Sequence, residues 1–222
     1  VELRDLEWAS KSSRGMVYNG IMELLDRLSI EQIRQRLQYL SEQTYDVPHQ
    51  WSPTECKQAG VLIPFVRQDD QWHIVFIRRA TLEGDHHSGQ VAFAGGKYEE
   101  QDPDLLATAL REAHEEIGVE PRHVEVLGAL NHHYSITRFQ ITPVVGYLDW
   151  PYPLKLDYAE VARVFTIPLR WLADPLNHRI VKRKLAEQPI PVVYFDEFDN
   201  ELLWGATARM TLSLVSCLTQ PT

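Results

Sequence analysis

The first fifty residues carry a hydrophobic pattern that is typical of helix. Ser29 and Gln32 have the spacing of a capping box, in which each side chain bonds the backbone of the other. Apolar residues then recur at helical spacing at Ile30, Ile33, Leu37 and Leu40. We interpret residues 1–52 as a helical extension with a linker, packed on a main domain over residues 53–222. The alternative is a dimerisation or partner-binding element.

From residue 60 onward the pattern changes to short apolar runs bounded by turn residues, which predict strands. Residues 60–67 and 71–78 flank a polar turn and predict a hairpin. Further strands are predicted at residues 89–93, 124–131, 138–148, 161–169 and 191–195. Helices are predicted after Gly96, around Trp171 and over residues 206–218. This order of elements predicts an α+β sandwich.

The helix after Gly96 has clear signals at both ends. Asp102 is predicted as its N-cap, Pro103 suits the first helical position and Asp104 complements the helix dipole. Gly118 supplies the C-terminal stop. Helical spacing predicts one narrow apolar face, made of Leu106, Leu110, Ala113 and Ile117.

Three carboxylates gather on the polar side of the same helix. Glu112 and Glu116 are one turn apart, with Glu115 beside them. Like charges at this spacing destabilise a helix by a few tenths of a kcal/mol, so a compensating cation is expected. Carboxylate oxygens suit the hard cations Mg²⁺ and Mn²⁺. The alternative is a solvated acidic face with Arg111 as its counter-ion.

Residues 111–119, Arg-Glu-Ala-His-Glu-Glu-Ile-Gly-Val, match every fixed position in the second half of the Nudix box. The chain therefore resembles the Nudix hydrolases over roughly residues 58–218. In the first half of the box, Gly96 and Asp102 each stand one residue early. That insertion, with residues 87–96 and 203–210, resembles the coenzyme A pyrophosphatase branch. The resemblance implies an α/β/α sandwich with a mixed sheet.

The resemblance also implies a metal site for Mg²⁺ or Mn²⁺. Glu112 and Glu116 would be the principal ligands, and Glu115 a further one. The Gly96 carbonyl would complete the site, and Arg111 would orient a glutamate. The metals would bridge the diphosphate oxygens and lower the pKa of an attacking water.

The general base and the substrate contacts are assigned by the same resemblance. Glu112 and Glu160 are alternative bases, because Glu160 opens a recurrent family segment. The predicted substrate-binding set comprises an arginine pair at a strand end, two residues of the matched element and an aromatic ring: Arg78, Arg79, His87, Gly95 and Tyr134. The pair His132-His133 lacks metal-binding partners at zinc spacing and is interpreted as surface.

The branch implies hydrolysis of coenzyme A or acyl-coenzyme A to 3′,5′-ADP and 4′-phosphopantetheine. Two residues depart from its pattern: Ala94 stands for a proline, and Asp85 for an arginine. Asp85 favours an alternative substrate such as ADP-ribose, a dinucleotide or an oxidised nucleoside triphosphate. A third possibility is a catalytically silent Nudix domain that binds a nucleotide and regulates a partner.

Composition and charge limit the kinds of molecule that the protein is expected to bind. The net charge of −9 argues against binding of nucleic acid, which needs a basic surface. No apolar stretch is long enough to span a bilayer, so no membrane contact is expected. Cys56 and Cys217 lie far apart, as expected of free thiols in the cytoplasm. Since Nudix domains often dimerise, a homodimer is a further expectation.

Overall fold

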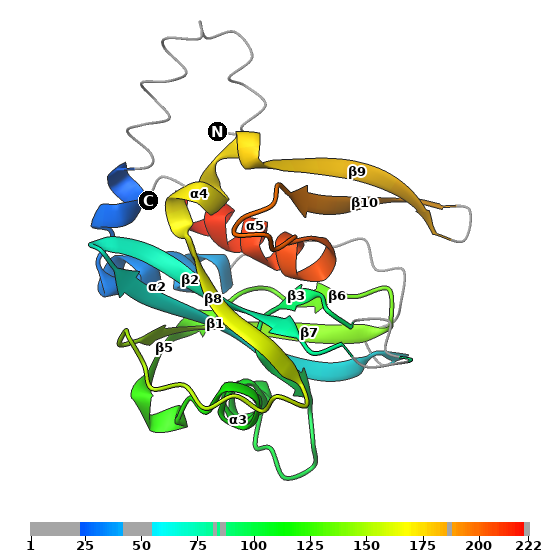
Figure 1. Ribbon diagram of the computed structural model, residues 1–222, viewed down its shortest axis with the longest axis horizontal. Coiled ribbons are helices and arrows are strands. Elements are labelled where there is room, and N and C mark those ends of the chain that lie inside the picture. Colours follow the sequence, from blue (N-terminus) through cyan, green and yellow to red (C-terminus); the bar gives the residue numbers. More distant parts are fainter. Residues whose placement is uncertain (1–22, 42–54, 82–83, 85–87, 186–187, 220–222) are drawn as a thin grey trace, which may run out of the picture.

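The computed structural model describes residues 23–41, 55–81, 84, 88–185 and 188–219 (Figure 1). Its longer helices are α2 (Ile30–Ser41), α3 (Leu105–Ile117) and α5 (Gly205–Thr219). Short helical pieces are η3 (Pro121–His123), α4 (Leu169–Ala173) and η4 (Pro175–Asn177). The strands are β1 (Lys57–Gln68), β2 (Gln71–Arg79), β3 (Val91–Ala92), β4 (Gly95–Lys97), β5 (Val124–Ala129), β6 (His133–Tyr134), β7 (Phe139–Leu148), β8 (Val161–Pro168), β9 (His178–Leu185) and β10 (Gln188–Phe195).

Within the described residues, eight of these strands form one mixed sheet, and β9 and β10 form a separate antiparallel ribbon. The main order is β3-β2-β1-β7-β5, with β4 paired to β1, β6 to β7 and β8 to β2. The central pair β1 and β7 is parallel, and its neighbours are antiparallel. The predicted mixed sheet is confirmed.

The predicted hairpin joins β1 to β2 through a two-residue turn. Gln68 pairs with Gln71, so the loop is Asp69-Asp70. Both aspartates have left-handed backbone, with φ of 50° and 59°. This is the conformation that two-residue hairpin loops favour, and aspartate tolerates it better than most residues.

Helices cover both faces of the sheet (Figure 1). Helix α3 lies on one face, whereas α2, α4 and α5 lie on the other. Alternation along β1 directs Leu62 and Val66 toward α3, and Ile63 and Phe65 toward the opposite layer. The central strands are therefore buried on both faces, as an α/β/α sandwich requires.

The described part of the N-terminal region, residues 23–41, packs into this core. Ser29 and Gln32 form the predicted capping box, with N···O distances of 2.9 and 3.2 Å. Ile33 and Leu37 are fully buried, and α2 contacts β5 and α5. Residues 1–22 and 42–52 of the predicted extension lie outside the described residues, so its boundary stays a prediction.

Two features of the sheet differ from the sequence-based expectation. Gly95 and Gly96, predicted to follow a strand, themselves form β4 against β1. Strand β9 was not predicted, because His178-Arg-Ile-Val-Lys-Arg-Lys-Leu185 carries charges on both of its faces. Strand β9 pairs with β10 in a separate two-stranded ribbon. The strand therefore lacks the alternation of apolar and polar residues by which a half-buried strand is predicted.

In the part of the chain that the structure describes, no helix combines the length and apolar character needed to cross a membrane.

Candidate active site

Helix α3 approaches the sheet closely at a glycine. A side chain at Gly60 in β1 would place its Cβ 2.4 Å from the carbonyl oxygen of Leu105, the first residue of α3. Asp104 caps the helix by accepting from the Ala107 amide at 2.8 Å. The predicted N-cap, Asp102, is therefore wrong by two residues. Gly118 ends the helix with φ of 72°, as predicted.

The buried face of α3 also differs from the predicted one. Leu106 is 39% exposed, so its inclusion in the apolar face was wrong. The face against the sheet instead carries Ala109, Ala113 and Ile117, together with the carboxylate of Glu116. Small side chains at the first two positions let the helix lie close to β1. With this face against the sheet, Glu116 lies against β4, where its carboxylate accepts from the Gly95 amide.

Asp102, freed from capping, anchors Arg111. Its two carboxylate oxygens accept from Nε and Nη2 of Arg111 at 2.9 and 3.0 Å. It also accepts from the hydroxyl of Thr108 and the amide of Glu99. The hydrogen bonds from Arg111 lower the pKa of Asp102 to about 2. These two parallel hydrogen bonds fix the plane of the Arg111 guanidinium.

The other edge of Arg111 faces the carboxylate cluster. Nη1 donates to Glu112 and to Glu115, each at 3.0 Å. Nη2 donates to the carbonyl of Lys97, just after β4's glycine pair, at 3.1 Å. Arg111 thus links β4 to two of the three glutamates of α3.

Glu116 is the most deeply buried member of the cluster. Only 3% of its surface is exposed. Its carboxylate accepts from the Gly95 amide at 3.1 Å and lies 3.9 Å from Nη1 of Arg79. These contacts do not compensate for burial, which raises the pKa of Glu116 to about 8. A buried carboxyl of this kind is a candidate functional group.

Glu112 lies beside Glu116 and against Gly96. A Cβ at Gly96 would fall 2.5 Å from the Glu112 carboxylate, so only glycine leaves room for it there. Burial raises the pKa of Glu112, and Arg111 opposes that shift. Glu115, in contrast, is 56% exposed.

Glu160 comes to this cluster from the loop before β8. Its carbonyl accepts from the Ala80 amide at 2.7 Å, which holds the loop against the end of β2. Its negative charge contributes to raising the pKa of both Glu112 and Glu116, so it lies near them. The structure therefore brings together residues from α3, β4, β2 and the loop before β8.

Other predicted substrate contacts lie elsewhere. Arg78 faces the opposite layer, because successive side chains alternate along a strand, and it pairs with Glu201 at 3.3 Å. The hydroxyl of Tyr134, in β6, donates to Gln140 at 3.2 Å. His87 lies outside the described residues. Of the members of the predicted set that the structure describes, Arg79 and Gly95 contact the glutamate cluster.

Comparison with known proteins now decides the family. Residues 57–187 match the NUDIX domain model. The Nudix hydrolase NudL of Salmonella paratyphi B is 34% identical over 194 residues, covering 85% of this chain and 94% of that protein. NudL of Salmonella typhimurium matches equally well. The chain belongs to the Nudix family. It is a pyrophosphohydrolase of that family.

Solved structures give weaker matches to this Nudix hydrolase. A MutT/nudix family protein from Enterococcus faecalis has a TM-score of 0.47 and 15% identity, covering 94% of this chain and 74% of that one. The NUDIX domain of Shewanella oneidensis NrtR complexed with ADP ribose has a TM-score of 0.40 and 23% identity, covering 60% and 82%.

Nudix hydrolases generally use divalent metals such as Mg²⁺, and the donor chemistry here fits one. All candidate side-chain ligands are carboxylates, and Glu116 is buried without a full counter-charge. Among the described residues, no three acidic, histidine or cysteine side chains already converge in metal-binding geometry. Arg111 holds Glu112 and Glu115 instead. Metal binding would therefore draw at least one glutamate away from Arg111.

The described part of this Nudix fold includes a larger and a smaller hollow. The larger, of about 870 Å³, lies at the N-terminal end of α3, between Lys57, Lys97 and His132. His132 bonds Thr142 there through Nδ1 at 3.0 Å, and its side chain is exposed, as the sequence predicted. No motif marks Lys57 or His132, because residues from separate strands form the hollow.

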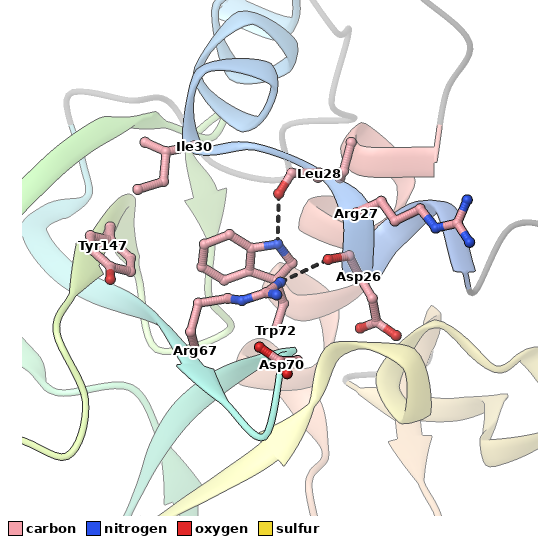
Figure 2. A pocket seen from close by; sticks show the side chains of 8 residues that line it. All are labelled: Asp26, Arg27, Leu28, Ile30, Arg67, Asp70, Trp72 and Tyr147. Carbon is pink, nitrogen blue, oxygen red and sulfur yellow. Dashed lines mark hydrogen bonds between the residues drawn. The ribbon is translucent and has the colours of Figure 1, made fainter.

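The smaller hollow, of about 510 Å³, lies beside residues 26–30 and the β1–β2 hairpin (Figure 2). Arg67 stacks 4.9 Å from the ring centroid of Trp72 and donates to the Asp26 carbonyl at 2.7 Å. The indole of Trp72 donates to the Leu28 carbonyl at 2.9 Å. These contacts hold the N-terminal segment on the sheet, and none of them involves the glutamate cluster.

Proposed function

We propose that this enzyme hydrolyses the pyrophosphate bond of coenzyme A or acyl-coenzyme A, giving 3′,5′-ADP and (acyl) 4′-phosphopantetheine. The observation that carries the proposal is the joint presence of two branch-like segments, residues 87–96 and 203–210, around a complete set of Nudix glutamates. The similarity to NudL over nearly its whole length supports the family activity rather than this particular substrate.

The glutamates of α3 would hold Mg²⁺ or Mn²⁺. Glu112 and Glu116 are the proposed principal ligands, with Glu115 and the Gly96 carbonyl as further donors. When bound, the cation supplies positive charge that neutralises the negative charge developing on the pyrophosphate oxygens. Arg111, fixed by Asp102, donates hydrogen bonds to Glu112 and Glu115. Glu116 is more deeply buried than either of them.

Glu160 is the proposed general base. Its side chain is exposed, and in the described part of the chain its carboxylate makes no hydrogen bond or ion pair. Glu112, the alternative base, already accepts from Arg111 at 3.0 Å. A carboxylate without a competing donor is better able to take a proton from an attacking water. The anchored Ala80–Glu160 backbone contact holds this residue at the edge of the cluster.

The test of the reaction is Mg²⁺-dependent turnover of coenzyme A beside ADP-ribose and NADH, with Glu116→Gln as the inactive control. Preferred cleavage of coenzyme A supports the proposal. Preferred cleavage of another substrate favours the alternative that Asp85 suggests. Absence of turnover with all three, in protein shown to bind Mn²⁺, supports the silent nucleotide-binding domain instead.

The role of Glu160 is separable from metal binding. Glu160→Gln should lower kcat by at least about 100-fold, since general bases contribute about 10²–10⁴-fold, while the affinity for Mn²⁺ stays near that of the wild type. Glu112→Gln should instead weaken Mn²⁺ binding. If Glu160→Gln retains full kcat and Glu112→Gln loses kcat without losing metal, Glu112 is the general base and Glu160 is not.

A further inference from the structure

The hollow at the N-terminal end of α3 adjoins strand β4, which also contacts the carboxylate cluster. Lys97 lines it and directly follows Gly96, whose α-carbon lies against the Glu112 carboxylate. The carbonyl of the same lysine accepts from Arg111 at 3.1 Å. A diphosphate held at the glutamates therefore has this hollow beside it, and one arm of the substrate can enter it.

The hollow has the size and lining of a nucleoside site. Its volume of about 870 Å³ lies within the range of about 300–1,000 Å³ that is usual for ligand pockets. Tyr98 lines it with a ring that is 42% exposed, which offers a surface on which a base can stack. His132 and Thr142, also in the lining, are bonded to each other and provide polar edges.

The charge of the hollow is opposite to that of the protein. Lys57 and Lys97 both line it, both are exposed, and neither forms an ion pair with any residue that the structure describes. Asp104, also in the lining, is occupied by capping α3 through the Ala107 amide. In a chain of net charge −9, two unpaired ammonium groups beside a diphosphate site indicate an additional anionic group on the ligand.

We propose that this hollow binds the nucleoside arm of the substrate and that Lys57 and Lys97 recognise a phosphate monoester on its ribose. Under the proposed function, on which this inference rests, that group is the 3′-phosphate of coenzyme A. Tyr98 stacks against the adenine.

The experiment compares two substrates that differ only in this phosphate: coenzyme A and 3′-dephospho-coenzyme A. In the double variant Lys57→Gln/Lys97→Gln, kcat/KM for coenzyme A should fall by about 10–100-fold, since a hydrogen bond to a charged group contributes about 1.5–3 kcal/mol. The value for dephospho-coenzyme A should change by less than about threefold, because that substrate lacks the recognised group. Lys155→Gln is the matched control, since Lys155 lies at the C-terminal end of α3, beside Gly118.

Equal losses on the two substrates, or no loss on either, would overturn the assignment. If the wild-type enzyme does not cleave coenzyme A, the proposed function fails, but the hollow is still testable by calorimetry with the fragments 3′,5′-ADP and 5′-AMP. Tighter binding of 3′,5′-ADP by the wild type, lost in the double variant and kept in Lys155→Gln, supports the lysine site. Equal affinity for the two fragments in the wild type contradicts it.

Discussion

Strand β2 ends in two arginines that meet two buried glutamates on opposite faces of the sheet. On the α5 side, Glu201 is 4% exposed and contacts Arg78 at 3.3 Å and Arg163 at 3.0 Å. On the α3 side, Glu116 is 3% exposed, and its ion pair with Arg79 has an N···O distance of 3.9 Å. The two glutamates are thus equally buried, but the negative charge of Glu201 is neutralised by close arginines, whereas that of Glu116 is only weakly neutralised.

The difference separates a structural carboxylate from a functional one. Arg163 donates a charge-assisted hydrogen bond to Glu201 and Arg78 forms a second ion pair with it, and breaking such a buried pair destabilises a protein. Glu116 keeps one amide donor and a distant guanidinium, and burial raises its pKa to about 8. A site built to receive a cation has to leave its carboxylate short of positive charge, because a full ion pair would compete with the metal.

The largest expected effect separates these two glutamates in catalysis. Glu116→Gln should lower Mg²⁺-dependent turnover by more than about 100-fold, because even changes to residues that only support metal ligands cost about 10–100-fold. Glu201→Gln should leave the turnover per folded molecule near that of the wild type. Steady-state assays at saturating Mg²⁺ check both. Equal losses in the two variants would remove the distinction.

The second expected effect is on the free energy of unfolding, where Glu201 should matter more than Glu116. Glu201→Gln should lower the free energy of unfolding by about 2 kcal/mol, less than a fully buried pair because its arginines are partly exposed. Glu116→Gln should leave the metal-free protein as stable as the wild type or more stable, since a neutral amide replaces a poorly compensated carboxylate. Urea denaturation in EDTA measures both variants. A larger loss in Glu116→Gln would contradict the comparison.

The third effect is a pH dependence of the metal-free protein. The pKa of Glu116 is raised from 4.5 to about 8, so the folded state binds its proton more tightly than the unfolded state. The resulting stabilisation is complete below pH 4.5 and is lost as the pH rises through about 8. Denaturation in EDTA between pH 5 and 9 should show this slope in the wild type and a weaker one in Glu116→Gln. A slope of the opposite sign would exclude a raised pKa.

The smallest effect concerns the exposed glutamate of the cluster. Glu115 is 56% exposed and shares Arg111 with Glu112. Glu115→Gln should change the free energy of unfolding by less than about 1 kcal/mol, as is usual for exposed ion pairs. Its affinity for Mg²⁺ should fall less than that of Glu116→Gln. A loss of stability comparable to that of Glu201→Gln would show that Glu115 is more than a peripheral donor.

Local signals predicted much of this fold. The capping box at Ser29, the β1–β2 hairpin and the Gly118 stop all depend on residues close in sequence, and the structure confirms them. The Nudix box likewise lies within one continuous segment, which is why its glutamates were found. Asp102 was misassigned because it satisfies the capping rule, whereas its actual partner, Arg111, lies two and a half turns along the chain.

Long-range contacts account for what the sequence did not show. The pairing of Arg78 with Glu201 joins β2 to a turn before α5, and no local pattern marks it. The hollow between Lys57, Lys97 and His132 depends on the pairing of β1 with β4 and β7. Strand β9 lacks the alternation that would have predicted it. Sequence periodicity describes one helix or strand at a time, so it does not predict which residues of different elements contact one another.

The central claim is that Glu116 is undercompensated because it binds a divalent cation. The most direct measurement is a titration with Mn²⁺ followed by electron paramagnetic resonance, at pH 8.5, in the wild type, Glu116→Gln and Glu201→Gln. We expect saturable binding in the wild type, similar binding in Glu201→Gln, and a loss of affinity of at least about tenfold in Glu116→Gln. Undiminished Mn²⁺ binding in Glu116→Gln would contradict the account.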